Sequence, residues 1–176
     1  MNIILIEDEK PAADKLQKAL QKINNKIHIL AVLKSVQESV LWFSTNPAPD
    51  LIFMDIELTD GTSMSIFDAV SIPCPVIFTT AYDEYWQAAF EHNSIDYLLK
   101  PIREEKLESD LEKYEKLKKF FEKNNINYSV YPVKTEHFES SDIQFTLNNI
   151  DKEKCKRLAK AFEYLQKNCG VPNEKF

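Results

Sequence analysis

Short apolar runs alternate with segments of helical periodicity through the first 123 residues, and this alternation constrains the fold more than any other feature. Five runs have the length and composition of strands buried on both faces, at residues 3–6, 27–33, 51–54, 76–79 and 97–99. Neighbouring parallel strands need a long crossover connection, which an intervening helix supplies. We therefore expect an α/β fold of the flavodoxin-like, doubly wound kind, with five parallel strands and five helices.

The segments between these runs carry the start and stop signals of helices. Pro11 suits the first turn of a helix, and the proline-rich stretch 46–49 ends the second one. A turn at Asp60-Gly61 precedes a short third helix. Two further helices are predicted, one with Trp86, Ala89 and Phe90 and one from about 103 to 123.

The pattern changes beyond Asn124. Two strand-like runs and one helix-like segment follow, at 128–133, 143–147 and 151–168. The first 123 residues hold 14 basic and 21 acidic side chains, whereas the tail holds 8 and 7. We expect a domain at 1–123 and, at 124–176, a short C-terminal extension of unknown role.

Composition narrows the class of protein. A net charge of −6 argues against a generally basic nucleic-acid binder. The three cysteines have neither a zinc-site spacing nor a disulfide framework, which indicates a reducing cytoplasm. Acidic residues close to the first apolar run exclude a signal peptide, and no run approaches the roughly 20 residues that span a bilayer. We expect a cytoplasmic protein with no membrane contact.

Polar side chains stand where the predicted strands end. They are Glu7 and Asp8 after the first strand, Asp55 after the third, Thr80 after the fourth and Lys100 after the fifth. The carboxyl ends of parallel strands form the ligand crevice of such a sheet. Three carboxylates gathered there repel one another unless a cation binds, and their oxygens favour Mg²⁺. The lysine and the hydroxyl suit the oxygens of a phosphoryl group.

Each of these residues has a simpler explanation when taken singly. Asp55 could cap a turn, Thr80 could be an ordinary strand residue, and Lys100 could be a surface lysine. Their common position at strand ends favours one shared site, in which Asp55 is the phosphoacceptor.

Four stretches of the chain carry a family resemblance: IILIEDE, LIFMDIELTDG, VIFTTAYDEY and DYLLKPI. Residues 1 to about 123 resemble a response-regulator receiver domain of bacterial two-component signalling. TTAYDEY followed by NSIDYLLKPI resembles receivers that usually precede a LytTR-type DNA-binding domain. The tail is about half as long as such a domain and shows none of its strand sequence.

The resemblance implies a metal site and a kinase partner. Asp55 would accept a phosphoryl group from a sensor histidine kinase. Asp8 and Asp55 would bind Mg²⁺ directly together with the backbone carbonyl of Glu57, and Glu7 would act through water. Such a domain catalyses only its own phosphorylation and dephosphorylation, so it works as a switch rather than as a metabolic enzyme.

The resemblance also implies a switch. Thr80 and Lys100 would contact the phosphoryl oxygens, Tyr97 would change rotamer with Thr80, and the peptide before Pro101 would be cis. The face made by the fourth helix, the fifth strand and the fifth helix commonly forms a homodimer in such receivers. Trp86 on this face could bind a partner or simply fill the core.

Three functional classes follow from the sequence. The first is a phosphorylation-controlled interaction protein that does not touch DNA. The second is a DNA-binding transcriptional regulator that acts through the tail or through a partner, although Glu153 and Glu163 dilute the basic residues of the tail helix. The third, a metal-dependent phosphatase, shares the acidic cluster but fits the surrounding motifs poorly.

Overall fold

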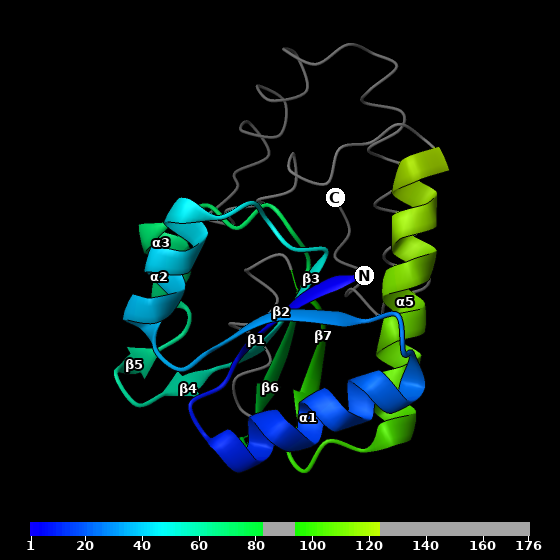
Figure 1. Cartoon of the computed structure of the whole chain (residues 1–176), viewed down its shortest axis with the longest axis horizontal. Helices are drawn as coiled ribbons and strands as arrows, with labels where there is room; N and C mark the ends of the chain where they lie inside the picture. The colour runs from blue at the N-terminus through cyan, green and yellow to red at the C-terminus, as the bar shows by residue number, and fades with distance from the viewer. Residues whose placement is uncertain (83–93, 124–176) are drawn as a thin grey trace, which may run out of the picture.

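A five-stranded parallel sheet forms the centre of the molecule in the computed structural model, which describes residues 1–82 and 94–123 (Figure 1). Its strands lie in the order β2-β1-β3-β6-β7, and every neighbouring pair is parallel. They span β1 Asn2–Ile6, β2 His28–Leu33, β3 Leu51–Asp55, β6 Val76–Thr80 and β7 Ser94–Leu99. The predicted doubly wound topology is confirmed, because the chain starts at β1, moves outward to β2 and then reverses to β3.

Helices cover both faces of this sheet (Figure 1). They are α1 Lys10–Ile23, α2 Val36–Thr45, α3 Ser65–Ala69 and α5 Glu104–Lys123. Helices α1 and α5 pack on one face, and α2 and α3 on the other. The helix expected around Trp86 and the elements expected beyond residue 124 lie outside the described residues. No helix in the described part of the chain is long and apolar enough to cross a membrane.

Strand β1 shows how one apolar run supplies side chains to the hydrophobic clusters on both faces of the sheet. Ile3 and Leu5 join the cluster under α1 and α5, while Ile4 and Ile6 join the cluster under α2 and α3. All four side chains are almost completely buried. Strands covered on both faces need apolar residues at consecutive positions, which explains why the sequence shows unbroken apolar runs here.

A small hairpin follows β3 and was absent from the sequence-based prediction. It pairs β4 Glu57–Leu58 with β5 Gly61–Thr62, and Thr59 and Asp60 form its turn. Gly61 has φ of 139°, a conformation that side-chain-bearing residues rarely adopt. The prediction of a turn at Asp60-Gly61 is confirmed. Strands of two residues are too short to show an alternating pattern, so the hairpin left no periodic signal.

Four charged side chains join β7 to α5. The Lys106 ammonium lies 2.8 Å from the Asp96 carboxylate and 2.7 Å from that of Asp110, and Lys113 also pairs with Asp96. Asp110 is fully buried, and its Oδ2 has no hydrogen-bond partner among the described residues. Burial, together with the neighbouring Asp96, raises the pKa of Asp110 to about 7.

Replacing Asp110 by asparagine should therefore flatten the pH dependence of stability. A carboxyl whose pKa is higher in the folded state adds stability that is complete below the unfolded pKa, roughly 3.9, and is lost as pH rises through the folded value. The free energy of unfolding of the parent protein should fall between about pH 4 and pH 7, by up to ~1.4 kcal/mol per pH unit.

Urea unfolding across this pH range measures the effect. The matched control is Asp14→Asn on α1, because Asp14 is exposed and Lys10 lowers the pKa of its carboxyl. Asp14→Asn should keep the slope of the parent protein. Equal slopes in the parent and in Asp110→Asn would show that Asp110 does not titrate here.

Candidate functional site

Three carboxylates meet at the carboxyl ends of two adjacent strands. Glu7 and Asp8 directly follow β1, and Asp55 is the last residue of β3, its hydrogen-bonded neighbour. One carboxylate oxygen from each of the three lies within 4.8 Å of the others. Glu7 and Asp55 are buried, while Asp8 is partly exposed. The structure thus brings together the three acids that the sequence placed at one sheet edge.

Lys100 approaches the same cluster from β7. Its ammonium lies 2.7 Å from Glu7 Oε2 and also hydrogen-bonds Asp55 Oδ2. The backbone N–H of Lys100 donates to the carbonyl of Thr80, at 2.7 Å, which fixes the chain where β7 ends. The Lys100-Pro101 peptide is cis, as the resemblance implied.

Burial and charge act against each other at this site. Burial raises the pKa of Asp55 and of Glu7, and Lys100 lowers both by a smaller amount. Burial also lowers the pKa of Lys100, but its hydrogen bonds to Asp55 and Glu7, together with the negative charges of these two groups, raise that pKa by more. The lysine is therefore held as a cation between two carboxylates that pay a desolvation cost.

One lysine does not balance the charge of three carboxylates. The cluster of Glu7, Asp8, Asp55 and Lys100 carries two excess negative charges when all four groups are ionised. Glu7 Oε1 is buried and has no hydrogen-bond partner among the described residues. Mg²⁺ binds oxygen ligands and matches this excess charge, so the residues present fit the predicted metal.

The hairpin after β3 orients Asp55. The backbone N–H of Glu57 points at Asp55 Oδ1, with a donor–acceptor distance of 3.3 Å. The N–H of Ile56 donates to the Thr79 carbonyl at 3.1 Å and ties this segment to β6. The role of the Glu57 carbonyl as a metal ligand stays a prediction.

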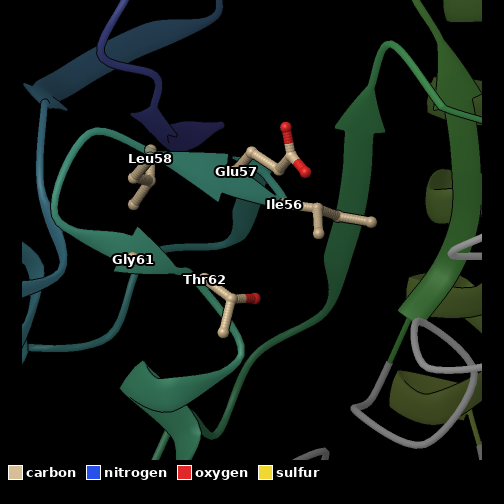
Figure 2. A pocket seen from close by; sticks show the side chains of 5 residues that line it. All are labelled: Ile56, Glu57, Leu58, Gly61 and Thr62. Carbon is tan, nitrogen blue, oxygen red and sulfur yellow. The ribbon is translucent and has the colours of Figure 1, made fainter.

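A shallow hollow of about 280 Å³ lies against the same hairpin (Figure 2). It is lined by Ile56, Glu57, Leu58, Gly61 and Thr62. Glu57 and Thr62 come from the two paired strands of the hairpin (Figure 2). None of the three clustered acids lines this hollow, but it adjoins the charged site through Glu57, whose N–H points at Asp55.

The two predicted switch residues meet at Tyr82. The Thr80 hydroxyl is buried and accepts a hydrogen bond from the backbone N–H of Tyr82, at 3.2 Å. The Tyr97 hydroxyl donates to the carbonyl of the same residue. Sequence reasoning missed Tyr82, because its contacts are made by the backbone and leave no mark on the choice of side chain.

A family model matches this chain over most of the described region. The model is that of the response regulator receiver domain, and the match covers residues 3–112. This range includes the acidic cluster, Lys100 and both switch residues.

Two relatives illustrate the similarity in sequence. The sensory transduction protein LytT of Bacillus anthracis is 32% identical over 121 residues, which are 67% of this chain and 48% of that protein. LytT of Bacillus subtilis is 32% identical over 120 residues, 66% of this chain and 49% of that protein. The chain thus spans about half the length of these curated relatives.

Two solved structures illustrate the similarity in fold. The N-terminal domain of a response regulator/sensory box/GGDEF 3-domain protein from Carboxydothermus hydrogenoformans superposes with a TM-score of 0.59, 26% identity, and coverage of 68% of this chain and 97% of that one. The response regulatory domain of protein mrkE from Klebsiella pneumoniae gives a TM-score of 0.56, 26% identity, and coverage of 70% and 99%.

Proposed function

Because this chain belongs to the family of response regulator receiver domains, we propose that it takes up a phosphoryl group on Asp55 and transmits a two-component signal. The general function of this family is to be phosphorylated by a histidine kinase. The observation that carries the assignment is the lysine bridge: Lys100 pairs with both Asp55 and Glu7 beside Asp8. A cognate sensor histidine kinase is the proposed donor.

Asp55 is the nucleophile in this proposal. A carboxylate oxygen of Asp55 forms a bond to phosphorus while the bond from phosphorus to the donor's leaving group breaks. Phosphoryl transfer requires mainly positioning and charge stabilisation from the protein. The Glu57 N–H and the Lys100 ammonium hold the two oxygens of Asp55 before the transfer.

Three acids, Asp55 included, would hold the metal. Asp8 and Asp55 would bind Mg²⁺ with the Glu57 carbonyl, and Glu7 would reach it through water. A cation held by these residues would neutralise charge on the phosphoryl oxygens. Once Asp55 is phosphorylated, Lys100 can pair with the new oxygens, and it already lies against the acceptor.

Thr80 and Tyr97 transmit the change. A phosphoryl group on Asp55 adds about −1.5 to −2 charges and offers acceptor oxygens to the Thr80 hydroxyl. A Thr80 hydroxyl drawn toward them would leave the Tyr82 N–H, and the Tyr97 hydroxyl bonds the same residue. The surface around β7 therefore differs between the two states.

Mg²⁺-dependent uptake of phosphate tests this function. The protein is incubated with acetyl phosphate in Mg²⁺ or in EDTA, and intact-mass analysis measures the added mass. We expect one phosphoryl group per chain with Mg²⁺ and none in EDTA. Equal uptake in both conditions would contradict a metal-dependent receiver, and continuous turnover of a generic phosphate ester would instead favour a phosphatase.

How the phosphorylated domain acts on other molecules is a second proposal, supported by fewer of the described residues. We propose a phosphorylation-controlled interaction protein that pairs with a second copy through the face containing β7 and α5. Lys106 and Lys113 of this face are already paired within the chain, with Asp96 of β7. The alternative is a DNA-binding regulator that acts through residues 124–176, and salt-dependent retention on a DNA column separates the two.

A further inference from the structure

We propose that Thr59 is a positioning residue of the metal site, which holds the carboxylate of Asp8 ready for the cation. This inference rests on the proposed function, because it needs Asp8 to be a metal ligand. Thr59 belongs to the hairpin turn. It was not identified from the sequence, because the site was predicted from residues at strand ends.

The contact between the two residues is direct. The Thr59 hydroxyl donates a hydrogen bond to Asp8 Oδ2 across 51 positions of sequence. Asp8 is the partly exposed member of the acidic cluster, whereas Glu7 and Asp55 are held by burial and by Lys100. A solvent-facing carboxylate would otherwise rotate among several rotamers. The hydroxyl fixes one oxygen and leaves Oδ1 for the metal.

The turn that carries Thr59 is itself anchored. The neighbouring Asp60 carboxylate accepts hydrogen bonds from the backbone N–H groups of Val36 and Gln37, at 2.8 and 3.1 Å. These groups lie in the first turn of α2, where free N–H groups and the helix dipole favour an anion. The same hydrogen bonds lower the pKa of Asp60. The turn that carries Thr59 is therefore held in a fixed position relative to α2.

The hairpin contacts both proposed metal-binding aspartates. At one end the Glu57 N–H meets Asp55 Oδ1, and at the turn the Thr59 hydroxyl meets Asp8 Oδ2. One six-residue segment thus sets the position of each carboxylate relative to the other. Hydrogen bonds to a metal's ligands orient them, and removing such a bond commonly weakens metal binding about 10–100-fold.

Isothermal titration with Mg²⁺ alone tests the proposal on the full chain. Thr59→Val keeps the shape of the side chain but removes the donor, and it should raise the dissociation constant about ten-fold or more. Thr59→Ser restores the hydroxyl and should bind Mg²⁺ nearly as the parent does. Thr62→Val is the matched control, because Thr62 is exposed on β5 of the same hairpin and its hydroxyl accepts from the Met64 N–H.

The possible outcomes separate this inference from the function on which it rests. Parent-like affinity in Thr59→Val would overturn the positioning role. A lower dissociation constant would also overturn it and would show that the Thr59–Asp8 hydrogen bond competes with the metal. Equal weakening in Thr62→Val would attribute the effect to the hairpin as a whole and also overturn it. A parent protein that binds no Mg²⁺ would overturn the metal site itself. Melting temperatures in EDTA should be equal for all four proteins.

Discussion

Replacing Asp55 by asparagine is expected to abolish the uptake of phosphate from acetyl phosphate. The amide oxygen is neutral and cannot act as the nucleophile that the carboxylate supplies. The substitution also removes one of the three charges that attract the cation. Intact-mass analysis in Mg²⁺ should show no added phosphoryl group, which is a loss of more than about a hundred-fold in labelling rate.

Two comparisons make this result specific. Asp68→Asn changes an exposed aspartate of α3, so it should be labelled as fast as the parent. The circular dichroism of Asp55→Asn should match that of the parent, because amide and carboxylate have nearly the same shape. Labelling that persists in Asp55→Asn would place the phosphoacceptor elsewhere, and Asp8 would be the first residue to examine.

The charged site was predictable from the sequence because it depends on topology. Each acid and Lys100 stands where an apolar run stops, and a parallel sheet brings such positions to one edge. The unbroken apolar runs identify the strands, so the residue after each run is predicted to lie in the crevice at the strand ends. Glu7 was expected to reach the metal through water. Its direct ion pair with Lys100 was not part of that prediction.

Features that depend on backbone or turn geometry left no such trace. Thr59 reaches Asp8 only because the hairpin folds back over the site, and its two-residue strands show no period. Asp96 of β7 and Asp110 of α5 were missed for another reason: periodicity reports apolar residues, whereas a charged side chain looks like a surface position even where it is buried or half-buried.

Lys100→Met should destabilise the metal-free protein more than any other single change at the site. Methionine keeps most of the length of the side chain but leaves Glu7 and Asp55 buried without their shared cation. Removing one partner of a buried ion pair costs about 3 kcal/mol or more. Urea unfolding in EDTA at pH 7 should show a loss of this size. Lys116→Met, which breaks an exposed pair with Glu112, should show no measurable loss.

The pH dependence of this loss identifies its cause. Burial already raises the pKa of Glu7 and Asp55, and the loss of Lys100 removes the group that lowers both. Carboxyls with raised folded-state pKa values stabilise fully below the unfolded values of about 4 and lose that stability as pH rises. The difference between the parent and Lys100→Met should therefore be small near pH 4 and grow toward pH 7. Added Mg²⁺ should stabilise Lys100→Met more than the parent, because the cation then replaces the missing charge. A difference that stays constant with pH would mean that Lys100 contributes packing rather than charge.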